Sequence, residues 1–263
     1  TPPRLKSSAA SDVYKRQGQF SWQRITLNRG LFPTNGSSTG VTLSLTIPGS
    51  DLNYYRLNLR QRFYRPISEN FVFGFQGELG YLDSYGDTEE TPFFQNFYAG
   101  GPRSLRGFES NTLGPRTTDA PCYEFNYEEE TCPNLIDIDG DGELDTPYYN
   151  PYANATSRSR YRDRPIGGNI KVEGSLQLIF RLPFIEDQRS IRSAFFFDFG
   201  NVFSDNCKDY QINCFKPSID DLRYSYGIGI TWITGFGPLS LAIAKPTNAG
   251  PQERTEEFQF TVG

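Results

Sequence analysis

Hydrophobic positions alternate with polar ones over much of the chain, in segments separated by turn-forming residues. In Val41–Ile47 every second residue is apolar, and the residues between them are Thr or Ser. A period of two is typical of a strand with one apolar and one polar face. The other segments of this kind are Gln19–Leu27, Tyr55–Phe63, Phe71–Tyr81, Lys171–Leu182, Ser193–Phe203, Leu222–Trp232, Leu239–Ile243 and Phe258–Val262. We therefore expect about nine strands.

The length and the two faces of these segments indicate a membrane barrel. Several segments span about ten residues, the length that a tilted strand needs to cross a bilayer. Aromatic residues make up 15% of the chain, which suits a barrel with aromatic girdles at the two interfaces. A soluble barrel with its apolar face inward is the alternative. Arg56, Arg60 and Arg62 lie beside large aromatics near a strand end, which favours apolar residues outward and polar residues inward. The sequence thus predicts an all-β fold, a transmembrane antiparallel β-barrel.

The connections between the predicted strands alternate in length, as in outer-membrane barrels. Tyr64–Asn70, Pro183–Arg189 and Ile233–Pro238 are short, and we predict that they are periplasmic turns. The connection at 83–168 is very long and Ser204–Asp221 is intermediate, so both are predicted to be external loops.

Composition excludes several kinds of function, and the first residues of the chain differ from the strand pattern of the rest. The net charge of −5 argues against nucleic acid as the main partner. The chain has no histidine, so no site within it can depend on a His base or a His metal ligand, and we expect no enzymatic activity. Residues 1–17 lack strand alternation and the apolar core of a signal peptide. We expect 1–17 to be non-native or disordered and 18–263 to form the barrel part.

The four cysteines form two pairs that are close in sequence, Cys122 with Cys132 and Cys207 with Cys214. All four fall on predicted external loops. Close pairing without CxxC spacing favours loop disulfides over zinc or redox chemistry, and four unrelated free thiols are the alternative. Two disulfides would place these loops in an oxidising compartment.

An acidic segment of the long loop, DIDGDGELD, has the spacing of a calcium-binding loop. Its aspartates occupy positions 1, 3, 5 and 9 of an EF-hand-like pattern and are Asp137, Asp139, Asp141 and Asp145. Position 12, where the pattern needs a bidentate glutamate, is Tyr148. A structural calcium site and a solvated acidic turn therefore both stay open, and no other cofactor is expected.

Several motifs resemble, in the same order, those of the BamA family of outer-membrane β-barrel assembly proteins (the surface-antigen/BamA superfamily). They are FYAGGPRSLRGFESNTLGPR at Phe97–Arg116, LNRGLFPTNG at 27–36, TIPGSDLNYY at 46–55, PIGGN at 165–169 and FFFDFGNVF at 195–203. The resemblance covers nearly all of 18–263. It implies a C-terminal fragment, about nine strands of a barrel of roughly sixteen. The family's periplasmic domains and first strands would lie outside this chain.

The resemblance implies that the long loop folds into the barrel lumen and docks there through its Arg-Gly-Phe tip. The residues that it assigns to this contact are Arg106, Gly107 and Phe108 of the loop, Asp198 and Gly200 of FFFDFG, and Gln177 on the neighbouring strand. The guanidinium of Arg106 offers a fork of donors that matches the carboxylate of Asp198. Some family members have a glutamate where this chain has Gln177. An amide can still accept a hydrogen bond, but the docking should then depend more heavily on Asp198.

The resemblance also implies a function, a location and partners. The expected function is that of an insertase, which folds nascent outer-membrane proteins into the bacterial outer membrane in contact with its lipids and with accessory assembly lipoproteins. The terminal strand, with Phe258, Phe260 and Val262, would form a lateral seam at which a client strand can pair. A polypeptide-translocation barrel of the same superfamily is the alternative, followed by a passive porin.

Overall fold

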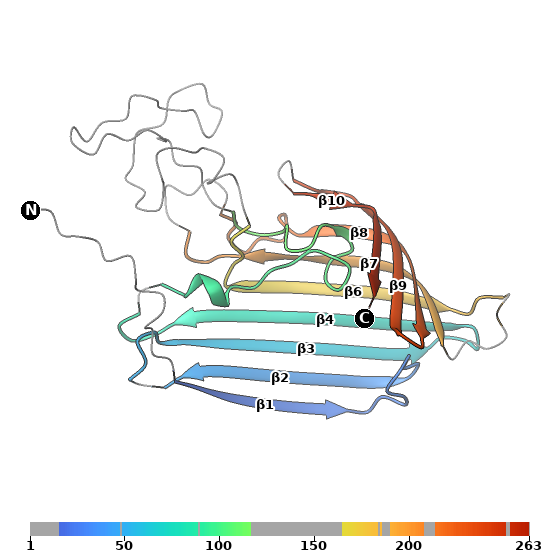
Figure 1. The fold of residues 1–263 in the computed structure, drawn as a ribbon, viewed down its shortest axis with the longest axis horizontal. Helices are drawn as coiled ribbons and strands as arrows, with labels where there is room; N and C mark the ends of the chain where they lie inside the picture. Colours follow the sequence, from blue (N-terminus) through green and yellow to red (C-terminus); the bar gives the residue numbers. More distant parts are fainter. Residues whose placement is uncertain are drawn as a thin grey trace, which may run out of the picture.

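Nine strands form one antiparallel sheet in the order β1-β2-β3-β4-β6-β7-β8-β9-β11 (Figure 1). The computed structural model describes residues 16–47, 49–88, 90–116, 165–183, 185, 190–207, 214–250 and 253–262. The strands of the sheet are β1 (Gln17–Ile25), β2 (Gly36–Thr46), β3 (Tyr54–Pro66), β4 (Phe71–Ser84), β6 (Ile170–Phe180), β7 (Ile191–Phe203), β8 (Arg223–Thr234), β9 (Gly237–Pro246) and β11 (Phe258–Val262). All nine predicted strands are confirmed, since each predicted segment overlaps one of them. Consecutive neighbours make the sheet an up-and-down meander.

The strand boundaries differ from the prediction where apolar and polar residues do not alternate. β2 begins at Gly36, well before the predicted start at Val41, and its first residues are Gly, Ser, Ser, Thr and Gly. Both neighbours pair with this stretch, since Ser38 lies opposite Ile25 of β1 and opposite Arg62 of β3. Ladder hydrogen bonds on two sides hold these residues in the sheet without help from an apolar pattern.

The apolar side chains of the strands lie on the outer, exposed face of the sheet. Phe20 is 64% exposed, Phe195 51% and Ile243 60%. Polar and small residues occupy the other face, which we call the inner face; Asp198, Ser225 and Gln259 are buried there. This distribution confirms the predicted orientation with apolar residues outward, the arrangement of a barrel wall in lipid.

The buried core lies between the inner face and a segment of the long loop. After β4 the chain passes through the short 3-10 helix η1 (Phe93–Gln95) and crosses the inner face, where it forms β5 (Gly107–Phe108). Figure 1 shows this segment in green, with the C-terminal strands curling round it. The residues buried in this contact are Tyr54, Leu82, Phe97, Ala99, Leu105, Phe108, Leu113 and Val202. Apolar burial therefore holds the loop inside the curve of the sheet.

Two isolated bridges and one short ladder tie the loop to the rest of the fold. Phe97 pairs with Gly168, and Arg116 pairs with Pro165, so both loop residues lie beside the chain that leads into β6. β5 pairs with β10 (Thr255–Glu256), which directly precedes the terminal strand. The sequence prediction did not include β5 or β10, because two-residue strands leave no periodic signal.

Within the part of the chain that the structure describes, no helix is long and apolar enough to span a bilayer. Among the same residues, β1 and β11 have a neighbouring strand on one side only.

Candidate functional site

The Arg-Gly-Phe tip of the loop lies against the inner face, as predicted, and its arginine is held by Asp198 on β7. Arg106 donates from Nε to Asp198 Oδ2 and from Nη2 to Oδ1, each at 2.7 Å. The backbone N–H of Arg106 also donates to Asp198 Oδ2 at 3.2 Å. The side chain of Asp198 has no exposed surface. A buried carboxylate with this bidentate partner fixes both the position and the direction of the loop tip. We call Arg106, Gly107, Phe108 and Asp198 the luminal lock.

The wall around the arginine is shaped to receive it. The guanidinium carbon lies 3.4 Å from the centre of the Phe196 ring, a cation–π arrangement. Phe196 is buried, and it shares the inner face with Asp198 because both occupy even positions of β7. Opposite it, a Cβ added at Gly227 would lie 2.7 Å from the Phe196 ring and 2.0 Å from the carbonyl oxygen of Ile243. A glycine is therefore needed at 227 to admit the ring.

Gly107 and Phe108 complete the lock. Gly107 has φ +89°, a conformation that strains any residue with a side chain, and an added Cβ would lie 3.2 Å from Ala244 Cβ and from Pro246. The loop backbone thus approaches β9 closely. Phe108 is fully buried in the core under the loop. Gly200, which was also predicted to belong to the loop contact, has no side chain with which to reach the loop. A Cβ at this position would lie 2.4 Å from the carbonyl oxygen of Val172 on β6. Its role is close packing of β7 on β6.

The expected hydrogen bond between Arg106 and Gln177 does not form. Gln177 Oε1 instead accepts from Arg192 at 3.3 Å, and its Nε2 donates to Ser175 Oγ at 3.3 Å. Ser175, one inner-face position closer to Arg106, accepts from Arg106 Nη2 at 3.0 Å. The prediction was wrong because Gln177 lies two residues beyond Ser175 on the inner face of β6 and so farther from Arg106. Ser175 binds the guanidinium in its place.

A second contact from β6 reaches the loop at Ser104. The hydroxyl of Ser104 donates to the carboxylate of Glu173, which also pairs with Lys171 at 3.0 Å. Lys171 in turn lies 3.7 Å from Glu78 on β4. Glu173 was not among the residues predicted for the site. Its alternation places it on the same face as Ser175, and that parity was the available signal.

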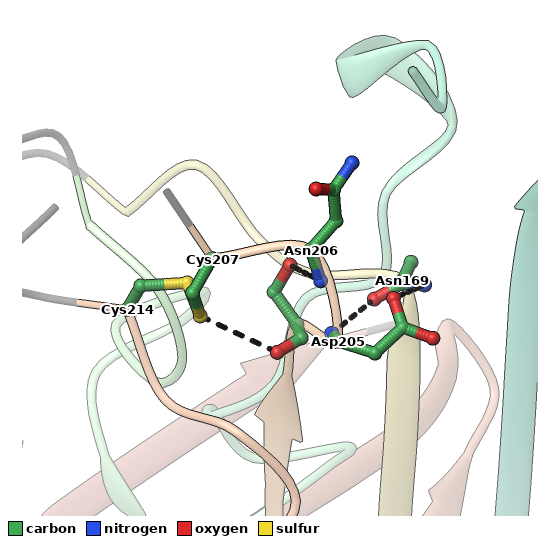
Figure 2. Close-up of a disulfide and its surroundings, with 6 residues drawn as sticks. Asn169, Asp205, Asn206, Cys207 and Cys214 are labelled. Atoms are coloured by element: carbon green, nitrogen blue, oxygen red, sulfur yellow. Dashed lines mark hydrogen bonds between the residues drawn. A yellow bond between two sulfur atoms is a disulfide. The ribbon is translucent and has the colours of Figure 1, made fainter. Parts of the chain in front are cut away.

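The predicted pair Cys207–Cys214 is confirmed as a disulfide in the loop after β7, with a Cα–Cα distance of 5.7 Å (Figure 2). Next to it, Asn169 donates from Nδ2 to Asp205 Oδ1 at 2.7 Å and accepts from the backbone N–H of Asp205 at 3.2 Å. These bonds join the start of the disulfide loop to the start of β6.

Two further predictions lie outside the described residues. They are the Cys122–Cys132 disulfide and the calcium site at Asp137, Asp139, Asp141 and Asp145. Where the structure does describe the chain, no group of three or more His, Cys, Asp or Glu side chains could hold a metal ion. Both predictions stay untested, as does the non-native origin of residues 1–17.

The predicted seam residues occupy the terminal strand as expected from their parity. Phe258, Phe260 and Val262 are 60%, 55% and 56% exposed on the outer face of β11. β11 pairs with β9, from Phe258 opposite Ile243 to Val262 opposite Leu239.

Comparisons with known proteins agree with the barrel fold. BamA of Neisseria meningitidis serogroup B, an outer membrane protein assembly factor, is 31% identical over 267 residues, which are 95% of this chain and 28% of that protein. A sorting and assembly machinery component 50 homolog of Mus musculus is 23% identical over 208 residues, covering 77% of this chain and 35% of its own length. The chain therefore spans about a third of the curated relatives it matches.

Among solved structures, BamA from Haemophilus ducreyi lacking POTRA domains 1–3 matches 94% of this chain and 41% of its own, with a TM-score of 0.69 and 30% identity. The fold is thus that of an outer-membrane β-barrel, as the outward apolar face requires. The Omp85 superfamily domain matches residues 3–263. This chain belongs to the Omp85 superfamily.

Proposed function

We propose that the protein carrying this barrel part folds and inserts β-barrel proteins into the bacterial outer membrane. The observation that carries the proposal is the pairing of β11, which among the described residues has β9 as its only neighbour in the sheet. The backbone N–H and C=O groups of its other edge are a template for a client strand. In lipid an unpaired edge is costly, so client pairing is favoured.

The proposed activity is strand exchange and involves no covalent step. It therefore requires no nucleophile, metal or nucleotide, in agreement with the expectation that the protein is not an enzyme. The partners that we propose are nascent outer-membrane proteins and accessory assembly lipoproteins. Lipid contact is supported by the exposed apolar outer face, which includes Phe20 and Phe195.

The test is a disulfide between a cysteine introduced in the first strand of the full-length barrel and Phe260→Cys in β11, with the protein reconstituted in liposomes. We expect the oxidised form to stop folding of an added β-barrel client and the reduced form of the same variant to restore it. Undiminished insertion by fully cross-linked protein would overturn the seam mechanism. Delivery of a soluble polypeptide into the liposome interior, with no insertion, would support a translocation barrel instead.

A further inference from the structure

The terminal strand is bound to the luminal lock through the side chain of Gln259. Gln259 Oε1 accepts from the backbone N–H of Gly107 at 3.3 Å, and its Nε2 donates to the carbonyl oxygen of Phe108 at 2.7 Å. Gln259 is only 2% exposed. Its side-chain amide thus meets one donor and one acceptor of β5, as the peptide group of a neighbouring strand would.

β5 is also held by the segment that precedes the terminal strand. Thr255 pairs with Phe108 and Glu256 with Gly107, so β10 lies antiparallel to β5. One step further, the N–H of Glu109 donates to the carbonyl oxygen of Arg254 at 2.9 Å. Only Glu257 separates β10 from β11, so both pairings belong to one continuous segment; Figure 1 shows the chain running from β10 to the C-terminus.

The segment from Thr255 to Val262 therefore has two partners: β10 pairs with β5 of the loop, while β11 pairs with β9. Small residues on β9 make room for the arrangement, since Ala242 and Ala244 are both buried beneath the loop tip. Gly107 lies against the same wall, as its 3.2 Å approach to Ala244 shows.

We infer that Gln259 is a positioning residue that couples the Arg-Gly-Phe loop to the terminal strand. β11 cannot swing away from β9 without breaking both amide bonds to the loop, and the loop cannot leave the inner face without releasing β11 and β10. Because Gln259 is buried, a broken contact leaves a polar amide without partners, so the two movements occur together. The inference rests on the proposed function for its consequence: release of the loop makes the terminal edge available to a client strand.

The experiment measures amide hydrogen exchange of the full-length protein in liposomes for Gln259→Ala and Gln259→Glu. A carboxylate at 259 can accept from Gly107, but it cannot donate to Phe108, and it would face Glu256, whose Oε2 lies 3.5 Å from the present Nε2. Thr261→Ala is the matched control, because Thr261 lines the same cavity of about 190 Å³ on the inner face. We expect exchange to accelerate about tenfold at both Gly107 and the β11 amides in the two Gln259 variants, and not in the control.

A reciprocal variant covers the case in which Gln259 substitutions prevent folding. Arg106→Lys weakens the contact of the loop with Asp198, since an ammonium cannot reproduce the two donors of the guanidinium. It should therefore accelerate exchange in β11 as well. Acceleration at the loop with β11 unchanged, or no acceleration at either segment, would overturn the coupling. Failure of the unaltered protein to insert a client would remove the proposed function, while the exchange result would still decide the coupling.

Discussion

The guanidinium of Arg106 and the carboxylate of Asp198, 92 positions apart in the chain, form two hydrogen bonds of 2.7 Å each on the inner face of the sheet. The Asp198 side chain is fully buried, so the fork replaces the water that the carboxylate loses on folding. One ion pair therefore fixes where a long loop crosses the sheet.

Arg106→Ala should release the loop, because it leaves the buried Asp198 carboxylate without its cationic partner. Removal of one partner of a buried pair costs about 3–5 kcal/mol. We expect faster proteolysis of the segment 85–116 in the folded barrel and a loss of insertion by the full-length protein. Arg62→Ala, which removes an inner-face guanidinium with no contact to Asp198, is the control. Normal loop protection in Arg106→Ala would contradict the lock.

Gly107→Ala should weaken the docking without changing any charge. Its φ of +89° strains a residue with a Cβ, and the new methyl group would lie 3.2 Å from Ala244 Cβ. The left-handed conformation alone costs about 1–2 kcal/mol. The measurement is the unfolding midpoint in urea, with Gly30→Ala as control, since a Cβ at Gly30 would meet nothing within 4 Å. Equal midpoints for the two variants would show that the loop tolerates the side chain.

Val41→Arg should destabilise the barrel in lipid, whereas Thr42→Arg should be tolerated. Val41 lies between Trp22 and Leu59 on the outer face, and Thr42 points to the inner face beside Ser21. An arginine facing the bilayer midplane costs about 2–4 kcal/mol in outer-membrane barrels. Folding equilibria in liposomes provide the comparison. A larger effect of Thr42→Arg would reverse the assignment of the two faces.

Both cysteine pairs should be oxidised in protein isolated from the envelope. For Cys207 and Cys214, seven positions apart, loop closure contributes about 2.5 kcal/mol if the bond is unstrained. Intact mass after alkylation without reductant should show no free thiol. Two alkylated cysteines, located at Cys122 and Cys132 by peptide mapping, would refute the Cys122–Cys132 prediction. Cys207→Ser with Cys214→Ser should loosen the contact between Asn169 and Asp205, which exchange measurements can follow.

Alternation along the chain predicted the nine strands of the sheet and the face that each presents, and the resemblance to the BamA family supplied the Arg-Gly-Phe residues and Asp198 of the lock. Alternation with a period of two is a local property, so the outward position of Phe195 and the inward position of Asp198 follow once the strand is recognised. The disulfide between Cys207 and Cys214 could also be predicted, because its partners are close in sequence.

Which inward residues meet depends on the tertiary structure. Parity puts Ser175 and Gln177 on one face of β6. The position of the loop along that strand makes Ser175 the partner of Arg106. The same holds for Gln259, whose partners Gly107 and Phe108 come from a segment about 150 residues away. A short ladder such as β5 with β10 has no periodic pattern of its own, since two residues gain their strand conformation from the neighbour that they pair with.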